Sequence, residues 1–199
     1  MNVLRRALAV TLGLWVLFGL AYPLVITGVS GIVFPYQAAA SPVVVNGRVV
    51  AAANVGQEFT AMDQFWGRPS ATVSLTTGKP QPYNAENSAP SNLGPTNPVL
   101  IEHVRGRIAH LLATTPGLKR DQIPPDLVES SGSGLDPDIS VQAALIQIPR
   151  VAKATGLTSA RLRALVATAT QGPDFGLFGK PVVNVVALNL ALERALRKR

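Results

Sequence analysis

The stretch ALAVTLGLWVLFGLAYPLVITGVSGIVF, residues 7–34, contains no charged side chain. A transmembrane helix needs about 20 consecutive, mostly apolar residues, so the stretch predicts a membrane-spanning helix. The competing interpretation is a cleaved secretory signal, because Ala38 and Ala40 form a small-x-small pattern before Ser41. The apolar core of such a signal has only about 7 to 15 residues, and the greater length of this stretch favours an uncleaved anchor.

Basic residues near this stretch predict its orientation. Arg5 and Arg6 precede it, and the next charged residue is Arg48. Basic residues beside a membrane helix favour the cytoplasmic side. We therefore expect residues 1–6 in the cytoplasm and residues 35–199 outside it, in the periplasm or the extracellular space.

Two pairs of small residues in the predicted helix indicate packing against a partner helix. They are Ala9 with Gly13 and Thr27 with Gly31, and such pairs let helix backbones approach closely. Pro23 is expected to kink the helix, a defect that neighbouring helices in a complex tolerate. The anchor is thus a candidate packing surface inside a membrane complex.

Composition limits the chemistry of the exported part. The 199 residues include no cysteine, which excludes disulfides, thiolate metal sites and thiol redox chemistry. The net charge is +7, but the excess of basic residues lies at the two ends of the chain. Because no basic stripe with interleaved aromatic residues is left, we expect no nucleic-acid partner.

Residues 35–199 predict a single α+β domain, without repeats, behind the one membrane helix. Asn46-Gly47 between two runs of valine and alanine predicts a β-hairpin, and residues 76–98 are too rich in Pro, Gly, Asn and Ser for anything but a long ordered loop. Apolar periodicity predicts the remaining elements. These are a helix from Pro98 to about Thr114 capped by Asn97, a helix from Ser140 to about Gly156 interrupted or kinked by Pro149, a helix after Thr158, a strand over residues 181–186 and a final helix over residues 188–195.

Two loops are candidate docking segments, SNLGPTNP at residues 91–98 and SGSGLDPD at residues 131–138. Their Asn, Ser, Gly and Pro residues offer backbone and amide groups rather than nucleophiles, which suits docking against another protein. The candidate docking residues are Ser91, Asn92, Leu93, Gly94, Pro95, Thr96, Asn97, Pro98, Ser131, Gly132, Ser133, Gly134, Leu135, Asp136, Pro137 and Asp138.

Catalytic and metal-binding patterns are weak. His103 and His110, the only histidines, lie about two turns apart on one helix face, too far to share a metal ion without other ligands. The run SSGSG does not match G-x-S-x-G, and no phosphate-binding loop is present. Asp136 and Asp138 are candidate ligands of a hard cation, but an Asp-Pro turn before a helix cap explains the same residues. We therefore assign no catalytic and no metal residues.

Five ordered motifs carry a family resemblance: FWGRPSA, YNAENSAPSNLGPTNP, IPPDLVESSGSGLDPDIS, QIPRVAKATGL and GKPVVNVVALNLALE. Behind one N-terminal membrane helix, they closely resemble the C subunit of the Kdp potassium-transporting P-type ATPase, and the resemblance covers essentially the whole chain. The chain departs from the family pattern at Asp138, where histidine is usual, and at residues 88–92, where SGGSN is usual.

The resemblance implies a non-catalytic accessory subunit of a high-affinity, ATP-driven potassium uptake complex in the bacterial inner membrane. The implied partners are a potassium channel-like subunit, a P-type ATPase subunit that hydrolyses ATP, and a small membrane subunit. ATP, Mg and potassium are used by that complex, and no cofactor is expected for this chain itself.

The family's C subunit is described as a catalytic chaperone that raises the ATP affinity of the ATPase subunit. Because the predicted topology separates the domain from cytoplasmic ATP, we expect any such effect to be indirect. The alternative from the residues alone is a membrane-anchored exported binding protein or hydrolase.

Overall fold

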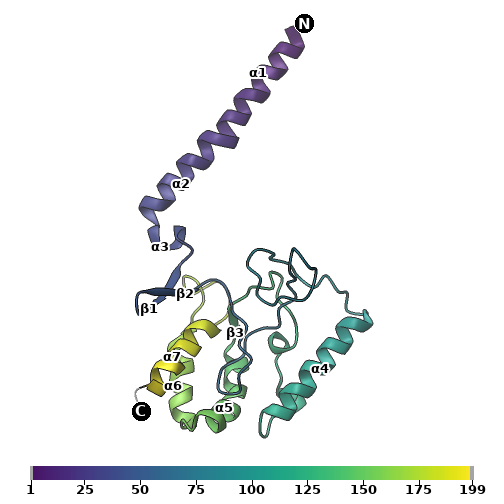
Figure 1. Cartoon of the computed structure of the whole chain (residues 1–199), viewed down its shortest axis with the longest axis vertical. Helices are drawn as coiled ribbons and strands as arrows, with labels where there is room; N and C mark the ends of the chain where they lie inside the picture. Colours follow the sequence, from purple (N-terminus) through teal and green to yellow (C-terminus); the bar gives the residue numbers. More distant parts are fainter. Residues whose placement is uncertain (1, 198–199) are drawn as a thin grey trace. The chain divides into compact units, whose positions relative to one another are not determined.

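The structure, a computed structural model, describes residues 2–197. It divides into two compact units with a boundary between Ala52 and Ala53. The first unit contains the apolar N-terminal helix and a hairpin, and the second contains helices and a small sheet (Figure 1). The predicted fold class, one N-terminal apolar helix with an α+β domain, is confirmed.

The N-terminal helix is one continuous helical run, Asn2–Val33, and none of its residues is buried. It consists of α1 (Asn2–Val16), the π-helical turn η1 (Leu17–Ala21) and α2 (Tyr22–Val33). At 1.5 Å per residue the run is roughly 48 Å long, more than the roughly 30 Å hydrocarbon core of a bilayer. It fits a single-pass membrane protein.

The expected disturbance at Pro23 takes the form of η1. Proline lacks a backbone N–H, and its ring crowds the carbonyl group four residues earlier, here that of Gly19. A π turn shifts the hydrogen-bonding pattern by one residue and accommodates the proline within an unbroken helix.

The first unit ends in a short helix and a hairpin. Helix α3 (Pro35–Ala38) precedes strands β1 (Pro42–Val45) and β2 (Arg48–Ala52), which pair antiparallel. Asn46 and Gly47 form the turn, with φ of 51° and 77°. Positive φ at both central residues is what a tight hairpin turn requires, so the predicted hairpin is confirmed.

The second unit begins with a long irregular segment. Residues 53–97 contain no helix or strand, and their one backbone bridge joins Val73 to Pro80. Helix α4 (Pro98–Thr114) then begins where predicted, and the amide N–H of Val99 donates to Asn97 Oδ1 at 2.9 Å. Two 3₁₀ turns follow, η2 (Arg120–Gln122) and η3 (Pro125–Leu127).

The remaining elements form a three-stranded antiparallel sheet with three helices. The strand order is β3 (Asp138–Ser140), β5 (Val182–Asn184), β4 (Thr170–Gln171). The helices are α5 (Val141–Thr155), α6 (Ser159–Ala169) and α7 (Val185–Arg197), of which α6 packs against both of the others (Figure 1).

Three predictions on these elements are corrected. The strand predicted over residues 181–186 ends at Asn184, because the Asn184 side chain accepts a hydrogen bond from the Ala187 N–H at 3.0 Å and so starts α7. Pro149 lies inside α5 without interrupting it, and the alternative prediction of a kink stays a prediction. The final helix, predicted over residues 188–195, is longer and runs from Val185 to Arg197. The predicted caps of α5 and α6 are confirmed, with Ser140 and Thr158 as N-caps and left-handed Gly156 ending α5.

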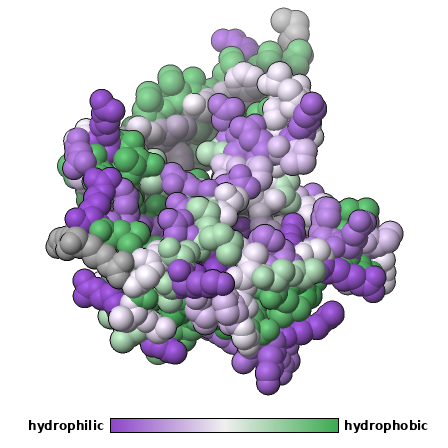
Figure 2. All heavy atoms as spheres, turned by 60° about the horizontal axis from the view of Figure 1, so that its bottom comes forward, coloured by the Kyte–Doolittle hydropathy of each residue, from purple (hydrophilic) through white to green (hydrophobic). Residues whose placement is uncertain are grey.

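The hydrophobic core lies within the second unit, between α5, α6, α7, the sheet and the irregular segment. Outside it, on the face drawn in Figure 2, apolar side chains occur in patches separated by hydrophilic ones. The buried apolar residues of the core are Phe65, Trp66, Leu111, Leu127, Val128, Ile139, Ala143, Ala144, Ile148, Val151, Leu162, Val166, Val183, Val185, Leu188 and Leu192.

Candidate functional site: a docking surface on rigid loops

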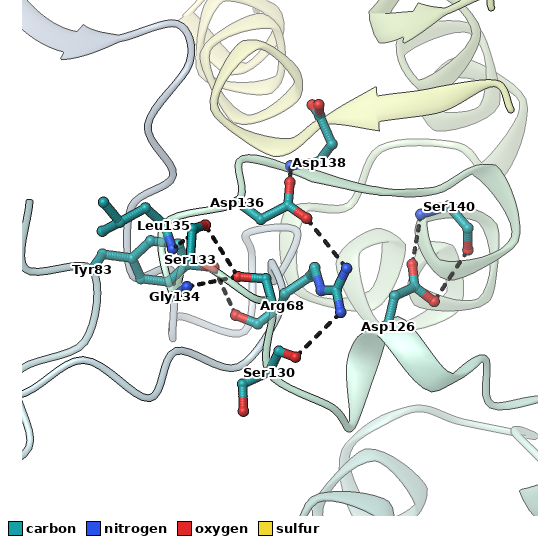
Figure 3. Close-up of polar contacts among 11 residues, drawn as sticks. Arg68, Tyr83, Asp126, Ser130, Ser133, Gly134, Leu135, Asp136, Asp138 and Ser140 are labelled. Atoms are coloured by element: carbon teal, nitrogen blue, oxygen red, sulfur yellow. Dashed lines mark hydrogen bonds and ion pairs between the residues drawn. The ribbon is translucent and has the colours of Figure 1, made fainter. Parts of the chain in front are cut away.

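The segment Ser131–Asp138 is held by hydrogen bonds to distant residues of the irregular segment. Ser70 Oγ donates to the Gly134 carbonyl oxygen at 2.7 Å, and Gly56 N–H donates to the Leu135 carbonyl oxygen at 2.8 Å. Within the segment, Gly134 N–H donates to Oγ of Ser131, which is buried. This segment is therefore a fixed part of the domain (Figure 3).

An ion pair joins the same two regions. Arg68 Nη1 lies 3.2 Å from Asp136 Oδ2, and Arg68 Nη2 donates to the Ser130 carbonyl oxygen at 3.4 Å (Figure 3). The other carboxylate oxygen, Asp136 Oδ1, accepts a hydrogen bond from the Asp138 N–H at 3.0 Å. Both oxygens of Asp136 thus have protein partners, which favours a turn over a cation site.

Asp138 differs from Asp136 in its surroundings. Its Oδ1 atom is buried and has no hydrogen-bond partner. Burial and, next, the charge of Asp136 raise the pKa of Asp138, while a hydrogen bond with Asn184 opposes the rise. Among residues 2–197, no group of three or more His, Cys, Asp or Glu side chains is placed to hold a metal ion.

Tyr83 fixes the irregular segment from within. Its hydroxyl group donates to the Arg68 carbonyl oxygen at 2.6 Å, and its N–H donates to Ser70 Oγ at 2.9 Å. Burial, followed by the charge of Asp136, raises the pKa of Tyr83 to about 12. A side chain on Gly56 would clash with this ring, since its Cβ would lie 2.3 Å from Tyr83 Cε1. These bonds hold the irregular segment together around Tyr83, and an ordered loop over the whole of residues 76–98 stays a prediction.

A half-open hollow of about 540 Å³ lies between the irregular segment and α4. Trp66 and His110 line it with their rings stacked, 5.0 Å apart between centres. Arg107 also lines it and donates to the Val128 carbonyl oxygen at 2.8 Å; burial lowers the pKa of Arg107. His110 is thus an aromatic wall residue, and His103, one of the exposed residues of α4, lines no part of this hollow.

The segment Ser91–Pro98 is exposed over most of its length. It makes short-range hydrogen bonds, such as that from the Asn97 N–H to the Gly94 carbonyl oxygen at 2.9 Å. It starts close to the other docking segment, because Ser88 Oγ donates to the Ser133 carbonyl oxygen at 3.1 Å. The docking role of both segments stays a prediction.

The most exposed apolar side chains of the second unit were not predicted from the sequence. They lie between β4 and β5, where Phe175, Leu177 and Phe178 are 93%, 81% and 68% exposed. We call residues 173–179 the β4–β5 finger. Its signal in the sequence is PDFGLFG, two phenylalanines and a leucine among residues that otherwise form turns.

The four small residues of the anchor are exposed along the described helix, and a Cβ on Gly13 or Gly31 would meet nothing within 4 Å. Ala9 and Thr27 are 18 positions apart, about five full turns of a regular α-helix. A regular helix would therefore place both pairs on one face, but the π turn η1 adds one residue to a turn and rotates the second pair by roughly 100° around the helix axis relative to the first. Packing of partner helices at these pairs remains a prediction, and the two pairs would contact partners on different faces of the helix.

These features fit a class of protein, a single-pass membrane protein whose α+β domain carries long, hydrogen-bonded loops. The model of one family, "K+-transporting ATPase, c chain", matches residues 4–194. The chain belongs to this family, which confirms the resemblance read from the sequence.

The sequences of curated relatives match this chain over nearly their full length. Three are each named "Potassium-transporting ATPase KdpC subunit". That of Methylorubrum populi is 50% identical over 98% of this chain and 98% of the relative. That of Variovorax paradoxus is 50% identical over 100% of this chain and 99% of the relative. That of Rhodopseudomonas palustris BisB5 is 49% identical over 98% of each.

Proposed function

We propose that this chain is a non-catalytic accessory subunit of an ATP-driven potassium uptake complex, and that its domain docks on the outer face of a channel-like subunit near the potassium entrance. The observation that carries the docking role is the bonded loop platform around Arg68, Tyr83 and Asp136, which fixes one docking segment while the other is exposed. Preorganised loops lose less entropy on binding.

The names of the relatives, which are subunits of a potassium-transporting ATPase, support partners within such a complex, and the family resemblance implies which partners we propose. They are the channel-like subunit, the P-type ATPase subunit and a small membrane subunit. In this proposal the ATPase subunit hydrolyses ATP with Mg, the channel-like subunit selects potassium, and this chain has no cofactor of its own.

The proposed location is the bacterial inner membrane, with the N-terminus in the cytoplasm beside Arg5 and Arg6 and the domain in the periplasm. A catalytic-chaperone effect on ATP affinity is then indirect. It passes through the anchor helix and the conformations of the partners as a coupling free energy between distant sites.

Single cysteines test the orientation, because the chain has none of its own. Asn2→Cys places a thiol on the proposed cytoplasmic side of the membrane, and Ala167→Cys places one on the proposed periplasmic side. Ala167 is exposed on α6. An impermeant maleimide is applied to cells with a permeabilised outer membrane. Labelling at position 167 alone is expected, and labelling at position 2 alone would reverse the orientation and make direct contact with cytoplasmic ATP feasible.

Charge insertion tests the docking role. Leu93→Glu with Thr96→Glu alters the exposed segment but keeps the Asn97 cap, and Thr76→Glu with Thr77→Glu is the matched control on another exposed loop. We expect the first pair to reduce co-purification of the complex and potassium uptake, and the control pair to leave both unchanged. Normal assembly and uptake in the first pair would refute docking through this segment.

The same experiment separates regulation from assembly. A purely structural subunit predicts uptake that falls in proportion to the amount of complex. A regulatory subunit predicts a larger loss of uptake, or an altered ATP dependence, per assembled complex.

A further inference from the structure

The β4–β5 finger holds its apolar side chains outward by a closed turn. Asp174 N–H donates to the Phe178 carbonyl oxygen at 2.9 Å, and Phe178 N–H donates back to the Asp174 carbonyl oxygen at 3.0 Å. Phe175 has a φ of 54°, a conformation that non-glycine residues seldom adopt. The tip is therefore a closed turn on which these apolar side chains are exposed.

The turn also satisfies its own backbone donors. Besides the two bonds above, Gly176 N–H donates to the Pro173 carbonyl oxygen and Leu177 N–H to the Asp174 carbonyl oxygen. A backbone that enters the apolar part of a bilayer must satisfy its polar groups internally, because no water is available there. The tip meets this requirement for four of its N–H groups.

The size and chemistry of the finger fit lipid better than a protein partner. Aromatic side chains bury about 150–250 Å² each, so two phenylalanines and a leucine offer at most roughly 750 Å², below the roughly 800 Å² per partner of a specific protein interface. Lys180 follows the finger and is exposed. A lysine beside an apolar tip can extend its ammonium group to the polar headgroups.

The chain itself keeps the finger close to a membrane. Only residues 34–52 separate the end of the apolar helix from the second unit. Even fully extended they would span roughly 65 Å, and α3 and the hairpin shorten that reach. Such tethering gives a high effective concentration at the bilayer surface.

We propose that the β4–β5 finger inserts Phe175, Leu177 and Phe178 into the lipid surface of the membrane in which the chain is anchored. This second contact fixes the height and tilt of the domain above the bilayer. It goes beyond the proposed docking function and is independent of it, because both leaflets present lipid and no partner subunit is needed.

The test uses the full chain alone, in vesicles of phosphatidylethanolamine and phosphatidylglycerol. Leu177→Cys carries an environment-sensitive fluorophore, and Ala167→Cys carries the same label at a matched exposed site on α6. We expect blue-shifted emission at position 177 that is quenched by lipids bearing a nitroxide on the acyl chain. At position 167 we expect neither effect.

A second variant excludes an effect of the fluorophore itself. Adding Phe175→Ser and Phe178→Ser to the Leu177→Cys chain should abolish the lipid quenching, since the remaining tip is polar. Equal, solvent-like emission at positions 177 and 167 in vesicles would overturn the proposal. So would protection of position 177 that appears only after the partner subunits are added, because the finger would then bind protein.

Discussion

Replacing Arg150 by alanine should strongly destabilise the domain. Arg150 lies on α5 and is 1% exposed. Its Nη1 atom donates to the carbonyl oxygens of Met62 at 2.7 Å and Gln64 at 2.9 Å, and its Nη2 atom donates to Gln147 Oε1 at 2.7 Å. Its Cζ atom lies 3.6 Å from the centre of the Trp66 ring. The Arg150 side chain thus joins α5 to the loop around Gln64, which leads directly into Trp66 in the wall of the hollow.

The magnitude is the difference between large opposing effects. Each hydrogen bond from a charged group contributes about 1.5–3 kcal/mol, and a desolvated cation on tryptophan contributes about 2 kcal/mol. Burying the charge costs several kcal/mol, and the same burial lowers the pKa of Arg150 to about 10 although the charge of Asp63 opposes it. We expect Arg150→Ala to lower the free energy of unfolding by about 3 kcal/mol.

Thermal unfolding of the full chain in detergent measures this loss. Trp66 fluorescence reports on the site, and a Trp15→Phe background removes the signal from the anchor. A loss of 3 kcal/mol corresponds to a fall in Tm of about 9 °C for a domain of this size. The control Arg163→Ala, exposed on α6, should change stability by less than about 0.5 kcal/mol. A loss below about 1 kcal/mol for Arg150→Ala would refute the reasoning.

Three further substitutions test the loops. In a urea titration, Gly134→Ala should lower the free energy of unfolding by about 2 kcal/mol. The reason is that φ at Gly134 is +67° and the new Cβ would lie 2.8 Å from the Ala89 carbonyl oxygen. The control Gly132→Ala, which has open space around it, should be nearly neutral. Ser140→Ala should cost about 1–2 kcal/mol by losing the cap of α5, seen as a lower urea midpoint, and an unchanged midpoint would contradict the cap. The pKa of Asp138 is raised in the folded state, so its negative charge opposes folding at a pH above that pKa. Asp138→Asn should therefore stabilise the domain at pH 7 and lose this gain toward pH 4. An equal gain at both pH values would contradict the raised pKa of Asp138.

Local chemistry explains which elements were predictable from the sequence. The helix starts at Asn97, Ser140 and Thr158 were read correctly because each cap bonds an amide two or three residues ahead. The hairpin at Asn46 was equally local. Such features depend on neighbours in the chain, and a single sequence contains them.

The features that were missed depend on distant contacts. Strand β3 has three residues and becomes a strand only by pairing with β5. Arg68 and Asp136 are 68 positions apart, and nothing near either residue indicates the other. The exposure of the β4–β5 finger likewise follows from where the core ends, because phenylalanine in a turn is as compatible with burial as with solvent.

The irregular segment also lacks any local reason to be rigid, and buried amide side chains supply one. Asn189 of α7 accepts a hydrogen bond from the Phe65 N–H and donates to its carbonyl oxygen, both at 2.8 Å. Gln147 of α5 does the same for Trp66, at 2.7 and 3.1 Å. Each amide takes the place of a paired strand, so two loop residues keep full hydrogen bonding without a sheet.

Buried amides are costly unless fully bonded, and here they pair backbone groups of Phe65 and Trp66 that an apolar pair would leave unsatisfied. Their bonds also fix the backbone that leads into Arg68 and the loop platform around it. A platform ordered before contact binds with a smaller loss of conformational entropy. The polar core therefore orders loops at the surface, and under the proposed docking role this order would favour binding.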